Sequence, residues 1–285
     1  MKNTFIPRGV IADMPSEDYH RSAGISNSML SDLARSPAHF YALHMAPDRP
    51  ERAPTPAMMA GTLAHCAILE PAALLDRYAV RPSDLDLRTT AGKELSRLNT
   101  GRDVISEAQY ETAIEQRKAV FAVAELSSIL QFGRPELSAF WTDEDTGLPC
   151  RCRQDWTHDN GDGTVTLLDV KTTTDASPEE FSRAVAKYGY HRQAWHYSRG
   201  FERASGRRVS RFVFAVVTNA YPFIAAAYVL DEETEAQACE EVTELLALYA
   251  SCKKSGNWPA FGQGCNVIGL PAWARRSTEI EVAYA

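Results

Sequence analysis

The sequence predicts an α/β fold with one core of strands and helices and a helical N-terminal region. Apolar residues recur at helical spacing through the first half, and strand-like and helix-like segments then follow in the order β-β-β-α-β-β-α. The first half shows no strand set of its own. We therefore expect a single domain over residues 1–285, with a helical part at about 1–135, an αβ core at about 136–255 and an irregular tail at 256–285.

Composition sets limits on function. The 285 residues are 45% hydrophobic and 24% charged, which excludes collagen-like, low-complexity and fully disordered chains. No apolar stretch reaches roughly 18 residues and the first residues lack a signal-peptide run, so we expect no membrane span and a cytoplasmic location. The net charge of −7 argues at first against a nucleic-acid partner, but binding depends on where charge lies.

Capping and breaking residues place the N-terminal helices. Ser26 is a candidate N-cap, Pro37 begins a second short helix, and a third helix runs through 58–68 and stops before Pro71. The prolines of 47–56 predict a loop ahead of that third helix.

The transition to the core is marked by a polar, irregular stretch at 80–101. Ser106 to Gln109 then resembles a capping box, and it starts a long helix whose apolar face reaches Ala124. Three strands follow, at 137–142, 150–157 and 164–170, with a dense turn signal at 159–163 between the last two.

The second half of the core begins with a capped helix. Ser177 is its N-cap with Pro178 at the first helical position, and the helical region continues to about Gly200, bent at Gly189. The remaining elements are strands at 209–218 and 222–230 and an acidic amphipathic helix at 231–250.

An acid and a cation lie together at the end of the third strand. Side chains on a strand alternate faces, so Asp169 and Lys171 point the same way. If the turn at 159–163 closes a hairpin, Asp155 lies near Asp169. Two neighbouring carboxylates repel unless a cation lies between them, and their oxygens suit Mg²⁺ or Mn²⁺. An Asp-x-Lys pair alone is more often a solvated surface pair. The residues around it therefore determine whether a catalytic role is favoured.

Three further side chains accompany this pair. Gln193 and Tyr197 are i and i+4 on the following helix and share one face. His65 sits in an otherwise apolar helix, where a histidine taken alone is more often a core residue than a ligand. The ordered set resembles the RecB-like branch of the PD-(D/E)xK nuclease superfamily, which combines G-x-x-x-H, a strand Asp, D-x-K and Q-x-x-x-Y.

Four sequence blocks resemble one family of that branch more closely, the RecE / exonuclease VIII family of phage-type recombination exonucleases. The blocks are ISNSML at 25–30, SPAHF at 36–40, GTLAH at 61–65 and YGYHRQ at 188–193. The resemblance covers about residues 10–255. It implies a restriction-endonuclease-like core, with a central mixed sheet flanked by helices.

The resemblance also implies a role for each residue. The implied metal ligands are His65, Asp155, Asp169 and the Val170 carbonyl. Lys171 would position the nucleophilic water, and Gln193 and Tyr197 would hold the DNA strand near the scissile phosphate. Glu136, just before the first core strand, matches an acidic residue of the wider superfamily, and Glu144 is its rival.

The family's activity is Mg²⁺-dependent digestion of linear double-stranded DNA from 5′ to 3′, with Mn²⁺ as a possible substitute. This leaves a 3′ single-stranded tail for recombination by strand annealing. The implied partners are therefore DNA ends and a RecT-like annealing protein. The implied assembly is a homo-oligomeric ring, a tetramer in RecE.

Some relatives hold an iron–sulfur cluster with four cysteines that flank the nuclease core. This sequence departs from that pattern, because Cys150 and Cys152 would share one face of a strand and the other cysteines lack C-x-x-C spacing. We expect no cluster, and six reduced, mostly buried cysteines.

Basic residues concentrate after the third strand. Residues 183–211 hold eight Lys and Arg and one acid, whereas residues 231–244 hold seven acids and no base. We expect phosphate contacts from five of them: Arg192, Arg199, Arg203, Arg207 and Arg208. The alternative is a solvated helix face.

Two other functions stay open. One is an inactive DNA-end clamp of the same fold, against which the intact Asp155, Asp169 and Lys171 argue, since binding alone does not require buried like charges. The other is a structure-specific or single-strand nuclease like the Cas4 group, against which the missing cysteine pattern argues.

Overall fold

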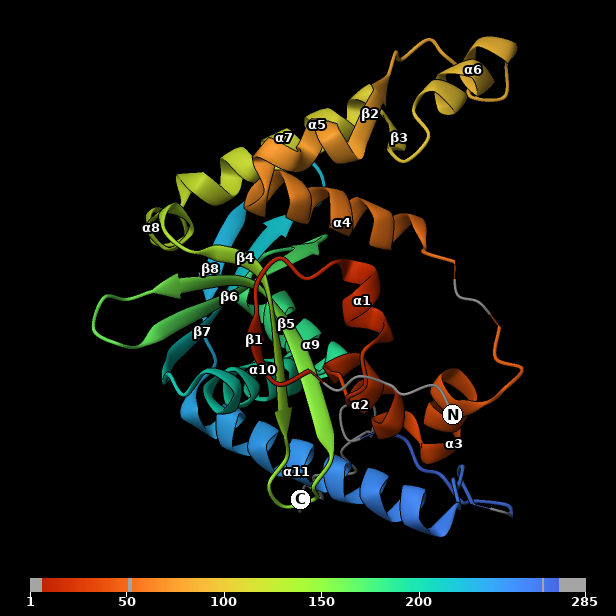
Figure 1. Ribbon diagram of the computed structural model, residues 1–285, viewed down its shortest axis with the longest axis vertical. Helices are drawn as coiled ribbons and strands as arrows, with labels where there is room; N and C mark the ends of the chain where they lie inside the picture. Colours follow the sequence, from red (N-terminus) through yellow and green to blue (C-terminus); the bar gives the residue numbers. More distant parts are fainter. Residues whose placement is uncertain (1–6, 51–52, 263, 272–285) are drawn as a thin grey trace, which may run out of the picture.

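The computed structural model describes residues 7–50, 53–262 and 264–271, and within them a six-stranded mixed sheet carries helices on both faces (Figure 1). The strand order is β1-β4-β5-β6-β7-β8; β6 and β7 are parallel and the other neighbours antiparallel. The strands are β1 (Gly9–Ile11), β4 (Arg134–Thr142), β5 (Pro149–Asp159), β6 (Val165–Thr173), β7 (Val209–Thr218) and β8 (Ala225–Tyr228). The predicted α/β class with a mixed central sheet is confirmed.

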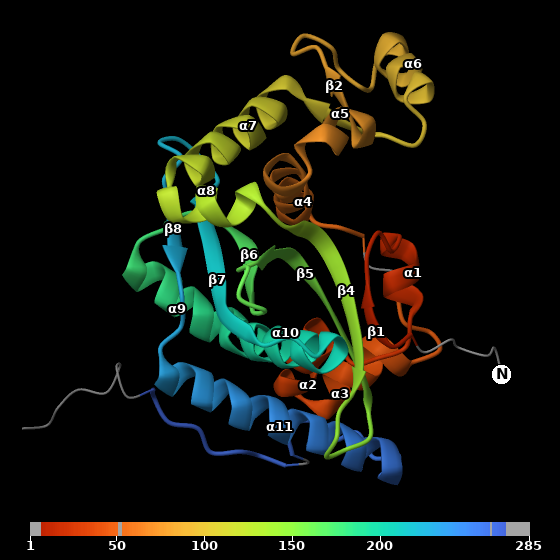
Figure 2. The same ribbon diagram turned by 60° about the vertical axis from the view of Figure 1, so that its left-hand side comes forward.

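Helices from distant parts of the chain cover the two faces of the sheet (Figure 2). The helices on one face are α4 (Pro56–Leu69), α7 (Glu107–Ala122) and α8 (Ala124–Gln131). Those on the opposite face are α9 (Pro178–Tyr188) and α10 (Tyr190–Ser205), with α11 (Glu232–Ser255) packed against α10. The alternation of β6 explains the two cores, because Leu168 and Val170 face α4, α7 and α8 while Val165 and Leu167 face α9 and α10.

Several helix signals are confirmed at the residues that carry them. Ser26 caps α2 (Asn27–Arg35), and Ser106 forms a capping box with Gln109 at the start of α7. Gly189 separates α9 from α10 with a φ of +69°, the left-handed region that a glycine adopts without strain. The long helix expected to reach Ala124 ends instead at Ala122, and α11 runs beyond the expected 250 to Ser255.

The expectation that the first half has no strand set of its own is wrong. β1 pairs antiparallel with β4, and β2 (Tyr78–Arg81) pairs parallel with β3 (Asp103–Ser106) in a separate two-stranded sheet. The stretch 80–101 also holds a helix, α6 (Thr90–Leu98), capped by Thr89. Strands of three or four residues are too short to show a period of two, and their partners are distant in sequence.

The remaining N-terminal elements are short helices: α1 (Ser16–Arg21), α3 (Pro37–Phe40), the π-helical turn η1 (Tyr41–Met45), the 3₁₀ turn η2 (Pro71–Ala73) and α5 (Leu74–Arg77). Four of the six cysteines are buried, as expected. The expectations for residues 1–6, for 51–52 of the proline-rich loop and for 272–285 of the tail lie outside the described residues.

No single helix in the described ranges is long and apolar enough to cross a membrane. One pair of helical segments, Pro56–Leu69 and Pro71–Arg77, has the length and apolar composition of a membrane span only when the two segments are taken together. The two segments are bent by 119° relative to each other.

Candidate active site

The candidate site lies where strands β5 and β6 separate. Their ladder runs from Asp159↔Val165 to Trp156↔Leu168 and stops there, whereas β6 stays paired with β7 as far as Thr173. Asp155 and Asp169 are the first residues beyond the last pair, one on each strand. The predicted hairpin therefore does bring the two carboxylates together, and it opens at the residues that carry them.

The open edge of β6 leaves the backbone of Val170 available to side chains. Its N–H donates to Asp155 Oδ2 at 2.8 Å, and its carbonyl oxygen lies 2.9 Å from His65 Nε2. His65 Nδ1 in turn lies 3.3 Å from Asp155 Oδ2. Helix α4 thus places its histidine across the fork, so that three of the four predicted ligands touch one another.

The fourth predicted ligand, Asp169, is held by two side chains. Gln193 Nε2 donates to Asp169 Oδ1 at 2.5 Å, and Gln193 Oε1 accepts from Lys171 Nζ at 2.9 Å. Lys171 also forms an ion pair with Asp169 Oδ2. The three side chains form a closed triangle in which each one contacts the other two.

Burial and charge set the ionisation of this triangle. Asp169 is 2% exposed, and its burial raises its pKa to about 6, a rise that Lys171 opposes and Asp155 reinforces. Burial acts to lower the pKa of Lys171, but the carboxylates of Asp169 and Asp155 outweigh it and raise that pKa. At neutral pH the ammonium therefore stays charged beside the buried carboxylate.

Two tyrosines on α10 complete the wall of the site. The Lys171 ammonium lies 4.5 Å from the ring centre of Tyr190, a cation–π contact. Tyr197, one turn beyond Gln193, packs its ring against Phe212, and burial followed by the nearby Tyr19 and Asp169 raises its pKa well above the ordinary value. The motif did not indicate Tyr190, although its spacing of three residues from Gln193 puts both on one helix face.

Glu136 joins the site from β4, as its position predicted. The β4–β5 ladder pairs Pro135 with Trp156 and Leu137 with Gln154, but Glu136 is not paired with Asp155 between them. The φ of Glu136 is +53°. Burial, with Asp155 adding to it, raises the pKa of Glu136 to about 7. The rival Glu144 lies in the β4–β5 turn, where it is mostly exposed and pairs with Arg203.

Beside the fork the surface is hollowed. A cavity of about 390 Å³ is lined by His65, Gly61, Glu70, Arg77 and Glu136 among others. Arg77 pairs with Glu70 through two hydrogen bonds of 2.7 Å. His65 and Glu136 therefore both line this cavity beside the fork.

The donors fit a hard divalent cation, although no three His, Cys, Asp or Glu side chains of the described ranges are close enough to hold one as they stand. Asp169 Oδ2 is buried, and Lys171 is its ion-pair partner. Ligands about 2.1 Å from an octahedral Mg²⁺ lie about 3.0 Å from one another. The 2.9 Å between His65 Nε2 and the Val170 oxygen is of that size. His65, Asp155, Asp169 and Val170 would hold the ion.

The predicted basic surface is not assembled beside the site. Arg192 is 16% exposed and donates to Glu241 of α11 at 2.7 Å, so its guanidinium faces the acidic helix. Three of the other arginines are paired with carboxylates of the chain: Arg199 with Glu202, Arg203 with Glu144 and Arg207 with Asp159. From Gln193 to Arg203 the helix rises about 15 Å. That these four arginines and the exposed Arg208 contact DNA phosphates stays a prediction.

Comparison with known proteins gives the same fold. The family model described as "PDDEXK-like domain of unknown function (DUF3799)" matches residues 26–271. A crystal structure of a Eubacterium rectale protein named "Putative exonuclease" matches with a TM-score of 0.60 and 15% identity, covering 86% of this chain and 88% of that chain. A structure of SSO0001 matches at a TM-score of 0.27 and 19% identity, over 66% and 86%, and adds no argument. No curated protein matches.

Proposed function

Because the chain belongs to this PDDEXK-like family, with a restriction-endonuclease-like core, we propose that it is a metal-dependent nuclease that hydrolyses phosphodiester bonds of DNA. The observation that carries the proposal is the fork of β5 and β6, where Asp155, Asp169 and the backbone of Val170 meet His65 and Lys171. A sheet that needed only stability would continue its ladder rather than bury two carboxylates there.

Each side chain at the fork has its own role in the proposed reaction. When bound, a divalent cation supplies positive charge for the phosphate and acidity for a water molecule. Gln193 fixes the Lys171 ammonium, whose charge orients the attacking water and stabilises the negative charge that develops on the phosphate. The ring of Tyr190 also contacts the ammonium. For Tyr197 the resemblance supports a contact with the DNA strand near the scissile phosphate.

The finer activity follows the resemblance. We propose Mg²⁺-dependent digestion of linear double-stranded DNA from 5′ to 3′, of the RecE / exonuclease VIII type, leaving 3′ tails for a RecT-like annealing protein. The four sequence blocks support it, and so does the name of the Eubacterium rectale neighbour, which describes an exonuclease. A homo-oligomeric ring, with a tetramer favoured, belongs to the same proposal.

The test is digestion of a linear duplex labelled at either its 5′ or its 3′ end, with Mg²⁺ or with EDTA. The wild type should release the 5′ label first and only with Mg²⁺, and Asp169→Asn and Lys171→Ala should lose at least about 100-fold in rate. Asp159→Asn is the matched control, because Asp159 ends the same strand pair as an exposed partner of Arg207.

Each alternative gives a different result. An inactive clamp would bind the duplex without releasing any label, and a Cas4-like enzyme would prefer single-stranded DNA. Loss of label that was equal in the wild type and Asp169→Asn would exclude this fork as the site of cleavage.

A further inference from the structure

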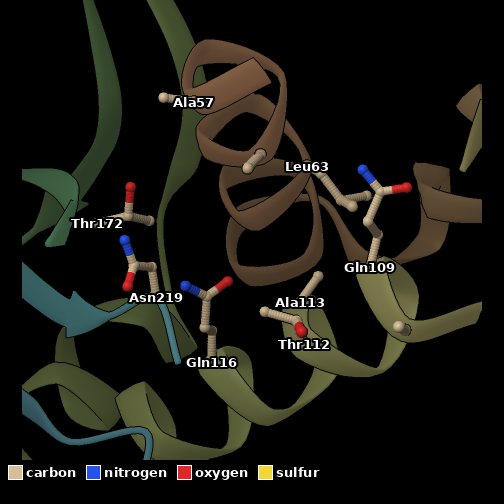
Figure 3. A pocket seen from close by; sticks show the side chains of 10 residues that line it. Ala57, Leu63, Gln109, Thr112, Ala113, Gln116, Thr172 and Asn219 are labelled. Atoms are coloured by element: carbon tan, nitrogen blue, oxygen red, sulfur yellow. The ribbon is translucent and has the colours of Figure 1, made fainter. Parts of the chain in front are cut away.

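A second cavity, of about 320 Å³, lies beside the proposed site on the α4 side of the sheet (Figure 3). Its apolar wall comes from Ala57, Ala60 and Leu63 of α4. Its polar side comes from α7 and from the C-terminal ends of β6 and β7: Thr112, Gln116, Thr172 and Asn219. Figure 3 shows Thr172, Asn219 and Gln116 next to one another across from α4.

The cavity lining carries no charge. None of its ten residues is acidic or basic, whereas the neighbouring cavity at His65 holds Glu70, Arg77 and Glu136. Phosphate groups in proteins are bound chiefly by Arg, Lys and backbone N–H groups. A phosphate is therefore a poor occupant, and the ligand must be a neutral group with hydrogen-bonding atoms.

Several polar side-chain atoms of the lining have no hydrogen-bond partner within the described part of the chain. Gln116 is only 3% exposed; its Nε2 donates to the Thr218 carbonyl at 3.1 Å, but its Oε1 receives no hydrogen bond. The same holds for the hydroxyls of Thr112 and Thr172 and for the Asn219 side-chain amide. The Gln116 oxygen can therefore accept a hydrogen bond from a group that enters the cavity.

The cavity starts close to the candidate catalytic residues. Lys171 and Thr172 are consecutive on β6 and point to opposite faces, so Lys171 meets α10 while Thr172 meets α4. On α4, Gly61 lies one turn before His65, about 6 Å along the axis. A Cβ placed at Gly61 would lie 3.9 Å from Thr172 Oγ1, so a residue that lines the cavity at His65 lies next to a residue that lines this one.

We propose that this cavity receives the nucleobase next to the bond that is cut, an inference that rests on the proposed nuclease function. The alanine wall offers a low apolar surface to the face of a base, and the amides and hydroxyls offer both donors and acceptors to its edge. The volume is at the lower end for ligand pockets and suits one base rather than a base pair. Because the lining holds both hydrogen-bond donors and acceptors, it can bond to the edge of any of the four bases.

The test compares intact DNA ends with ends that carry an abasic residue at the terminal or the penultimate position of the cleaved strand. The wild type should cut one of the two abasic ends about tenfold more slowly, the effect of one or two lost hydrogen bonds. Ala60→Phe fills the cavity and should cut the intact and abasic ends at the same reduced rate. Ala122→Phe, the same change at an exposed site of α7, should behave as the wild type.

Equal cutting of all ends by the wild type, or an abasic penalty that persists in Ala60→Phe, would overturn the proposal. The same ends are compared for binding in EDTA, where the wild type should prefer the intact end and Ala60→Phe should not. The binding comparison tests the cavity even if no DNA is cut. An absence of cutting would count against the nuclease proposal and not against the cavity proposal. If Ala60→Phe does not fold, Thr112→Val, which removes only a hydroxyl, should reduce the abasic penalty about threefold.

Discussion

Replacing Gln193 by Leu should weaken both the fold and the activity, because Gln193 ties Asp169 to Lys171. The side chain makes one hydrogen bond of 2.5 Å to a carboxylate and one of 2.9 Å to an ammonium. Hydrogen bonds to charged groups contribute about 1.5–3 kcal/mol each. Asp169 is 2% exposed, so water does not replace the lost donor. Leucine keeps the apolar contacts of the glutamine. With the lower value for each hydrogen bond, the free energy of unfolding should fall by about 3 kcal/mol.

Urea unfolding at pH 7 without metal ions measures this loss, and digestion of labelled duplex measures the activity. The rate should fall about 100-fold, because the ammonium is no longer held in place. Gln131→Leu is the control, since Gln131 is exposed at the end of α8 and should change stability by less than about 0.5 kcal/mol. If Gln193→Leu were as stable as that control, the closed triangle would not exist in solution; normal activity would remove Gln193 from the mechanism.

The remaining predictions concern folding. Burial lowers the pKa of His196 to about 4, so the unfolded chain binds the extra proton first as pH falls; this one group should cost about 3 kcal/mol of stability between pH 6.5 and 4. The raised pKa values of Asp169 and Glu136 act in the opposite direction, so the loss is measured by urea unfolding as the stability of the wild type relative to His196→Phe, which should fall by that amount. Gly189→Ala should cost about 1–2 kcal/mol, because its φ is left-handed and because the Arg192 guanidinium must move away from the new Cβ. Gly206→Ala shares the φ without the overlap, so its melting temperature should fall less.

The parts of the site that the sequence predicts are those that depend on local periodicity. The alternation of a strand puts Asp169 and Lys171 on one face, and the helical repeat does the same for Gln193 and Tyr197. The turn signal after Asp159 closes the hairpin as expected. What periodicity cannot show is the register at which the ladder ends, and that register is what leaves the backbone of Val170 open to His65.

Charge was harder to read from the sequence than periodicity. A run of arginines is visible in the chain, but the carboxylates that pair with Arg192, Arg203 and Arg207 come from α11, the β4–β5 turn and β5, which are distant in sequence. The acidic helix, for example, places Glu241 against Arg192 and His191. For the same reason the net charge of −7 does not describe the surface near the site. Strand β1 escaped prediction because its three residues are ordered by their partner β4.

The central claim is that the fork of β5 and β6 is a divalent-metal centre, and a crystal grown with Mn²⁺ tests it most directly. The anomalous difference map should show a peak in contact with His65, Asp155, Asp169 and the Val170 carbonyl, and that peak should be absent from crystals of Asp169→Asn. A wild-type crystal with no peak at the fork, or an unchanged peak in the variant, would contradict the claim.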